Sequence, residues 1–235
     1  MEKLIYVVWR PEDGDVEELS LRLRGPVAVA LQAAGARGVQ INVTDVTVAD
    51  AALNRAPWGR PADAVVSLWV DSWRDEVRQP LEEALRAAAG EIAGWLVTES
   101  VPLTPPVHPA GDRTPGLSNI AFIRRPDTMT PPQWVDRWHN HHTTVAIETQ
   151  ATFGYVQNLV VRNLTPNAIP VDGIVEELFP IEALTDQHAF YGSGGDSEEL
   201  AERKRRMTES VSGFLRNEAT GVMPTSRFVL SSPFA

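Results

Sequence analysis

The sequence contains no cysteine. Disulfide bonds, thiolate nucleophiles and cysteine-ligated metal sites are therefore excluded. Long apolar runs are also missing, because the apolar stretch near the N-terminus, Leu4–Trp9, ends at Arg10 and Pro11. A run of this length is too short for a signal peptide core or a membrane span. We expect a soluble, unprocessed, cytoplasmic protein.

Basic residues are few compared with acidic ones. The chain has 21 Lys and Arg against 31 Asp and Glu, which gives a net charge of -10, and both halves share the acidic excess. Nucleic acids and anionic membranes are not expected partners, because each phosphate contact needs a cation. The one basic run, Arg203–Arg206, is surrounded by glutamates and is typical of a solvated helix face.

Sequence motifs for phosphate binding and for serine nucleophiles are absent as well. The glycine-rich segment Gly192-Ser-Gly-Gly195 follows no strong strand pattern and contains no lysine, so it predicts a flexible loop. No Gly-x-Ser-x-Gly motif occurs. We expect no cofactor.

What the sequence does contain is an ordered series of strand and helix patterns. With 235 residues, 43% of them apolar, it can bury one full core or two small ones. Asp15 is positioned to cap a helix that reaches Ala34, and Pro26 should kink or divide that helix. The other elements expected in this half are strands at Leu4–Trp9, Val39–Val46, Ala64–Val70 and Gly94–Val101 and a helix at Gln79–Ala89.

Residues 102–118 contain five prolines and two glycines, which is the composition of a linker. They separate an N-terminal unit, residues 1–101, from a C-terminal unit, residues 119–235. In the second unit, Thr130 caps a helix that reaches about Thr149. The remaining elements expected there are strands at Asn119–Arg124, Phe153–Arg162, Gly173–Phe179 and Ser226–Leu230 and helices at Thr185–Tyr191 and Ser197–Asn217.

Each half therefore has the order β-α-β-β-α-β, which is typical of ferredoxin-like units. Residues repeat too: Gly25-Pro-Val-Ala28 corresponds to Thr143-Thr-Val-Ala146, and Asp63-Ala-Val-Val66 to Asp172-Gly-Ile-Val175. Two such sheets can cover each other's exposed faces. The fold class we expect is α+β, with two tandem ferredoxin-like halves forming an α/β barrel within one chain. A monomer would then be complete, and a further homodimer stays open.

Three histidines and two tryptophans lie in one predicted helix, Trp134–Val145. His142 shares the apolar face of this helix with Trp134 and Trp138, because residues four apart lie on the same side. Imidazole is well suited to proton transfer near neutral pH. We predict that His142 is catalytic. The alternative is a hydrogen-bonded histidine in the core.

Glu176 lies in the middle of a predicted strand among apolar neighbours. A carboxylate there is costly unless it is paired, so Glu176 is a second catalytic candidate that orients the imidazole or acts with a raised pKa. A salt bridge across the sheet is the alternative. Residues that could contact a substrate, or else simply pack in the core, are Tyr155, Trp138, Phe122, Trp69, His141 and Arg24.

A metal site is not expected. His139, His141 and His142 are close in sequence, but they lack the His-Glu-x-x-His spacing and a recognisable third ligand. One of His139 and His141 should be a surface residue. For Arg24, an ion pair with Glu17 or Glu18 competes with a role as an anchor for a substrate oxygen.

The second half contains a set of short motifs: Asn119–Pro126, Met129-Thr130, Trp138-x-x-x-His142-x-x-Val145, Tyr155–Asn158, Asp172–Glu176 and Ser226–Val229. In these motifs it resembles the EthD family of dimeric α/β barrel proteins. In the family, the helix motif continues from the histidine with a small residue, proline and leucine. Here Thr143-Thr144-Val145 replaces them, and the first half has Arg24 at the histidine position.

The resemblance implies a barrel that holds a small, mostly apolar molecule. EthD itself is associated with a cytochrome P450 system for ether breakdown, and similar proteins include polyketide dehydratases, polyketide cyclases and muconolactone-type isomerases. Two functions follow as hypotheses. One is a cofactor-independent enzyme of small apolar carbonyl compounds that uses His142. The other is a non-catalytic binding or accessory protein that uses the same cavity.

Overall fold

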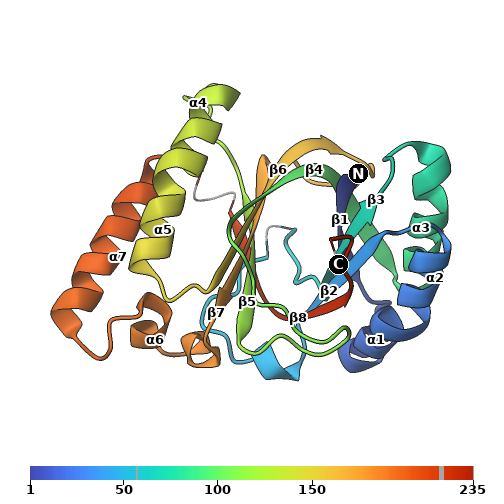
Figure 1. Cartoon of the computed structure of the whole chain (residues 1–235), viewed down its shortest axis with the longest axis horizontal. Helices are drawn as coiled ribbons and strands as arrows, with labels where there is room; N and C mark the ends of the chain where they lie inside the picture. The colour runs from blue at the N-terminus through green and yellow to red at the C-terminus, as the bar shows by residue number, and fades with distance from the viewer. Residues whose placement is uncertain (57, 217–219, 235) are drawn as a thin grey trace.

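The computed structural model describes residues 1–56, 58–216 and 220–234, and in it eight antiparallel strands close into a single barrel (Figure 1). Neighbours around the barrel follow the order β1-β3-β2-β8-β5-β7-β6-β4. The strands are β1 (Glu2–Trp9), β2 (Gly38–Val43), β3 (Ala64–Val70), β4 (Glu91–Leu103), β5 (Leu117–Ile123), β6 (Gly154–Asn163), β7 (Gly173–Phe179) and β8 (Gly221–Ser231). The mixed α and β composition and the barrel agree with the sequence analysis.

Each half of the chain contributes four consecutive strands to the barrel. In the first half the spatial order is β4-β1-β3-β2, and in the second half it is β8-β5-β7-β6. This is the same order in both halves, the one that the ferredoxin-like pattern predicts. The halves are joined by two antiparallel pairs, β2 with β8 and β4 with β6. One chain therefore closes the barrel, and no strand edge is left open in it.

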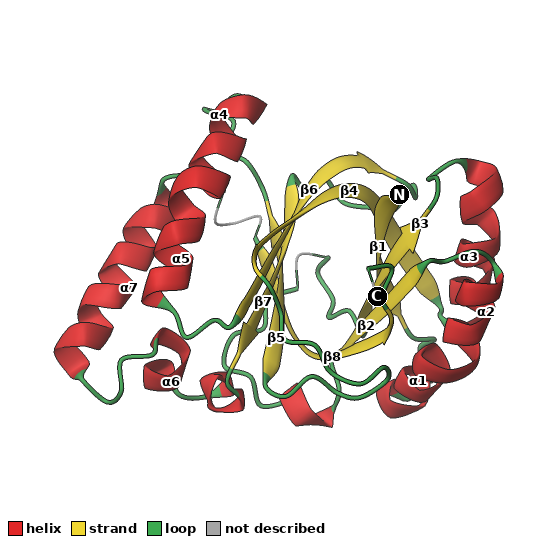
Figure 2. Ribbon diagram, in the orientation of Figure 1, coloured by secondary structure: helices red, strands yellow, loops and turns green. Residues whose placement is uncertain are grey.

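The helices cover two opposite outer sides of the barrel (Figure 2). On one side lie α1 (Val16–Arg22), α2 (Ala28–Ala33) and α3 (Asp75–Ala88), and on the other lie α4 (Pro131–Asp136), α5 (Thr143–Thr149) and α7 (Ser197–Ser212). The short α6 (Gln187–Tyr191) and the 3-10 turns η2 (Val46–Val48) and η4 (Ile181–Leu184) complete the structure. The predicted C-terminal end of the last helix, Asn217, lies outside the described residues.

Local sequence signals explain where these helices begin. The Asp15 side chain accepts a hydrogen bond from the Glu18 backbone nitrogen at 2.9 Å, and Asp196 does the same for Glu198 at 2.8 Å. A capping box formed by Thr130 and Gln133 begins α4. Pro26 divides the first helix as predicted, because it lies in a π-helical turn, η1 (Leu23–Val27), between α1 and α2. Proline has no N–H to donate, and the wider turn accommodates that loss.

A second π-helical turn, η3 (Arg137–His142), separates α4 from α5 and contains the histidine-rich segment. Extra turns of this kind often occur at functional sites, since they change the direction in which side chains leave the helix. Among the helices of the described residues, none is long and apolar enough to cross a membrane.

Strands β1, β2 and β3 are buried on both faces, which explains why Leu4–Trp9 is apolar without alternation. Leu4, Tyr6 and Val8 pack under the helices, whereas Ile5 and Val7 point into the barrel. One end of the barrel is filled with side chains. Trp58 packs there against Phe122 and Trp9, with ring centroids 4.7 and 5.4 Å apart, and the fully buried Trp95 lies beside them.

Because only one end of the barrel is filled with side chains, we expect two tryptophans inside the barrel to differ in how much stability is lost when each is replaced by alanine. Trp95→Ala should lower the free energy of unfolding by about 3–5 kcal/mol, because it leaves a cavity in a packed region. Trp69→Ala should cost at most about 2 kcal/mol, since Trp69 lines a cavity at the other end. Urea unfolding of both variants measures the difference. Equal losses would contradict this description of the barrel.

Candidate functional site

The end of the barrel opposite the tryptophan cluster contains a cavity of about 680 Å³, named here the barrel cavity. Most of its charged lining residues lie on the strands, and much of its apolar lining comes from the segment between β4 and β5 and from the C-terminal residues. The strand residues that line it are Lys3, Gln40, Trp69, Glu99, Val101, Val156, Glu176, Arg227, Val229 and Ser231.

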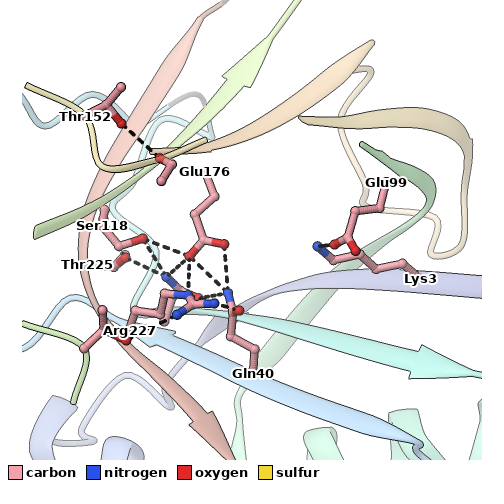
Figure 3. A network of polar contacts seen from close by, with 11 residues as sticks. Lys3, Gln40, Glu99, Ser118, Thr152, Glu176, Thr225 and Arg227 are labelled. Carbon is pink, nitrogen blue, oxygen red and sulfur yellow. Dashed lines mark hydrogen bonds and ion pairs between the residues drawn. The ribbon is translucent and has the colours of Figure 1, made fainter. Parts of the chain in front are cut away.

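Glu176 is the centre of a buried polar cluster in this cavity (Figure 3). The Gln40 amide donates to both carboxylate oxygens at 3.0 Å, and Asn42 and Ser118 donate to Oε1 at 3.1 and 3.0 Å. The Arg227 Nε atom lies 3.2 Å from the same oxygen. The carboxylate is thus paired and hydrogen-bonded by groups from three other strands.

These partners decide the charge of Glu176. Burial alone would raise its pKa, but the charges of Arg227 and Lys3 and the hydrogen bonds from Gln40 and Asn42 lower the pKa below its ordinary value. The raised pKa considered in the sequence analysis is therefore wrong in direction. Glu176 is an ionised group that holds its neighbours in place, and the salt bridge across the sheet describes it better.

A second ion pair lies apart from this cluster. Lys3 and Glu99 pair on neighbouring strands, and Figure 3 shows them apart from Glu176, with no contact drawn between the pair and that carboxylate. The Lys3 ammonium also lies 4.7 Å from the centroid of the Trp69 ring, a cation–π contact. Trp69, predicted to contact substrate, does line the cavity.

The Arg227 side chain is hydrogen-bonded to the described residues through only some of its nitrogen atoms. Its Nε atom lies 3.2 Å from Glu176 Oε1 and donates to the side-chain oxygen Oε1 of Gln40 at 3.2 Å, and its Nη1 donates to Thr114 Oγ1 at 3.2 Å. Its Nη2 has no hydrogen-bond partner among the residues that the structure describes. The guanidinium can therefore donate to an oxygen of a bound molecule.

The segment predicted as a linker forms a wall of the cavity. Its residues Gly111 and Thr114 donate backbone hydrogen bonds to Val229 and Arg227 of β8 at 2.9 and 2.8 Å, so the segment is fixed to the barrel. His108 in the same segment lines the cavity. Its Nε2 atom is buried and has no partner among the described residues.

Sequence reasoning missed His108, because a proline-rich segment suggests a connector between units. The available signal was a lone histidine among prolines and valines, Pro105-Pro-Val-His-Pro109, where no other polar side chain competes for a contact.

His142 lies outside the barrel, where it contacts Ser210 of α7 and Phe214. Its Nδ1 atom is 2.9 Å from Ser210 Oγ, its ring centroid is 4.3 Å from that of Phe214, and it is only 5% exposed. Burial, together with the charge of Arg137, lowers its pKa to about 4. The side chain is therefore neutral at pH 7.

The structure does not bring His142 and Glu176 together. On β7, Val175 packs in the cluster under the C-terminal helices while Glu176 points into the barrel, because successive strand residues face opposite sides. His142 does not line the barrel cavity. It also does not line either of the two smaller pockets, which have volumes of about 460 and 280 Å³. A catalytic role for His142 stays a prediction.

The other residues predicted to contact a substrate lie in different parts of the structure. Tyr155 and Trp138 are buried under the C-terminal helices, and burial raises the pKa of Tyr155. Phe122 belongs to the filled end of the barrel. The ring of His141 is exposed, 3.7 Å from Asp136, as expected for one histidine of that helix.

Arg24 lies outside the barrel. Its guanidinium carbon is 4.2 Å from the Phe228 ring centroid, and its Nε donates to Ser20 at 3.1 Å. No ion pair joins it to Glu17 or Glu18 within the described residues. Among those residues no cluster of three or more His, Asp or Glu side chains could hold a metal.

Comparison with known proteins identifies part of the chain. The sequence model of the EthD domain matches residues 126–202. This segment is similar to the EthD domain. It begins just after β5 and ends within α7, so it includes the histidine-rich helix, β6 and β7. No curated protein matches the sequence of the chain.

Two solved structures share the fold. A "putative monooxygenase" from Lactobacillus acidophilus NCFM has a TM-score of 0.51 at 11% identity, covering 98% of this chain and 95% of its own. An anthrone oxidase-like protein has a TM-score of 0.58 at 8% identity, covering 100% of this chain and 94% of its own. The fold that these structures share with this protein therefore extends over the whole chain.

The position of His142 predicts a pH dependence of stability. The pKa of His142 in the folded protein, about 4, is below the unfolded value of about 6.5. The contribution of the neutral His142 ring to the free energy of unfolding is therefore complete above pH 6.5 and is lost as the pH falls through 4. The loss is of the order of 3 kcal/mol. Urea unfolding at pH 7 and pH 4 should show a smaller decrease for His142→Gln than for the wild type. The exposed control, His141→Gln, should follow the wild type.

Proposed function

We propose that this protein is a cofactor-independent enzyme that binds a small, mostly apolar carbonyl compound in the barrel cavity and moves a proton on it. The observation that carries the proposal is the combination of an apolar wall with two cations, the buried Lys3 and the partly buried Arg227, in one cavity of about 680 Å³. A pocket with many apolar and few polar groups is typical of small-molecule sites.

Binding depends on donors that the protein does not use itself. Arg227 Nη2 has no hydrogen-bond partner among the described residues, and the Lys3 ammonium has three N–H groups, one of which donates to Glu99. Both can donate to a carbonyl or phenol oxygen. Trp69, Val156 and Val229 offer apolar contacts for the body of the same molecule.

We place the proton transfer at His108. Its Nε2 would take the proton from the carbon next to the carbonyl group, and the electron pair of that C–H bond would become the enolate. The negative charge on the enolate oxygen is then stabilised by Lys3 and Arg227. Return of the proton to a different carbon gives an isomer, and loss of a β-hydroxyl group as water, with that proton, gives a dehydration.

This assignment moves the acid–base role predicted for His142 to another histidine. His142 has a pKa lowered to about 4 and its Nδ1 is bonded to Ser210, so it is a weak base that opens onto none of the described pockets. The EthD match and the description of two similar folds as monooxygenase and anthrone oxidase-like support chemistry on small organic molecules. A non-catalytic binding protein is the second candidate, because the same cavity would serve it.

We also propose that the two halves, residues 1–101 and 119–235 joined by 102–118, are copies of one ferredoxin-like unit. Support comes from the identical strand order in each half and from a π-helical turn in the first helical segment of each, η1 and η3. The C-terminal half retains the EthD sequence, and the N-terminal half has diverged.

Proton abstraction can be measured with 1-tetralone, a small aromatic ketone. In D₂O the protein should accelerate exchange of the hydrogens next to the carbonyl, observed by proton NMR. His108→Gln should reduce the rate by about 100-fold or more while leaving the ketone affinity nearly unchanged. His141→Gln is the matched control and should retain the wild-type rate. Saturable binding without accelerated exchange would support the binding protein instead.

The contribution of Lys3 can be tested without leaving a charge unpaired. Replacing both members of the pair, Lys3→Met with Glu99→Gln, removes a donor and its counterion together. Ketone affinity, measured by calorimetry, should fall by about 5- to 30-fold, the value of one charge-assisted hydrogen bond. The matched control is the exposed pair Arg37→Met with Asp71→Asn, which should bind as the wild type does. An unchanged affinity in the Lys3 variant would exclude Lys3 from the site.

A further inference from the structure

The smaller of the two pockets outside the barrel lies beside α6. Its volume is about 280 Å³, and η4 and the residues after η2 complete its walls. Its apolar lining comes from Leu117, Ala183 and Phe190, and Phe190 is stacked on Phe179 with ring centroids 4.4 Å apart. An apolar cavity of roughly 150 Å³ already accommodates benzene, so this pocket has room for a substituted ring.

Asn119 of β5 is a lining residue with an unsatisfied amide. It is only 5% exposed, and its Oδ1 is buried without a hydrogen-bond partner in the described part of the chain. A buried amide oxygen without a partner is costly, and such groups are rare in native structures. A ligand that donates an N–H or O–H to this oxygen would remove the cost.

Glu177 of β7 is directly opposite Asn119 across the strand pair. Its Oε1 is also buried and has no partner among the described residues, and burial raises its pKa to about 7. Burial and the charge of Glu177 together raise the pKa of Tyr191, which lines the pocket. Two unsatisfied acceptors therefore lie on adjacent strands at the same side of the sheet.

The rim of the pocket decides the charge of its occupant. Lys204 of α7 lines the pocket, and its ammonium donates to Gln187 Oε1 at 2.9 Å. Asp186 also lines the pocket, so its lining carries one cation and one anion, and this balance favours a neutral occupant over a charged one. We infer that this pocket binds a small neutral molecule with an apolar body and an amide or hydroxyl donor, which is directed at Asn119 Oδ1. The site is independent of the barrel cavity.

Benzamide is a suitable probe, because it combines a ring with two N–H donors. Titration into the ¹⁵N-labelled full chain should give saturable backbone shifts in Ala51–Leu53 and Gln187–Tyr191, the two segments that flank the pocket. Shifts confined to the barrel cavity, or no saturable shift up to the solubility limit, would overturn the inference.

Two variants identify the contacts. Asn119→Leu removes the acceptor and should weaken benzamide binding by about tenfold or more. Ala52→Trp fills the pocket from an exposed position and should weaken binding even if Asn119→Leu does not fold. Ala49→Trp, at an exposed position three residues earlier that does not line the pocket, is the matched control and should bind normally. Unchanged binding in a folded Asn119→Leu variant, or in Ala52→Trp, would contradict the assignment.

Discussion

The Glu176 carboxylate joins strands that come from both halves of the chain. Its partners Gln40 and Asn42 lie on β2, Ser118 lies on β5 and Arg227 lies on β8, so one buried anion connects the strands on either side of a junction that closes the barrel. Removing one member of such a cluster leaves a buried charge or donor without a partner, which typically costs several kcal/mol. The closed barrel and the polar cavity therefore depend on the same interaction.

The two ends of the barrel have different physical roles. At one end, tryptophans and Phe122 fill the space and supply packing energy. At the other end, the strands carry charged side chains that cannot pack tightly without partners, and a cavity remains between them and the segment that precedes β5. Because that segment is hydrogen-bonded to β8, the wall that carries His108 is part of the barrel and not a loose connector.

Much of the fold was predictable from the sequence, and the site was only partly so. Periodicity gave two strands, Ala64–Val70 and Gly173–Phe179, with the bounds that the structure has. It also placed Trp69 and Glu176, which do line the cavity. Alternation along β7 could not reveal which face is the inside of the barrel, since both faces are buried. That ambiguity is why His142 and Glu176 were paired although they lie on opposite sides of the sheet. His108 was missed because its environment is created by distant residues of β8.

The central claim is that a ligand enters the barrel and not the helix-covered side of the sheet. Intermolecular nuclear Overhauser effects between 1-tetralone and the labelled protein measure this directly. The account predicts contacts from the ketone ring to the side chains of Trp69 and His108. Contacts to the rings of Trp138 and His142 would contradict it, and would return the active site to the helix in which the sequence first suggested it.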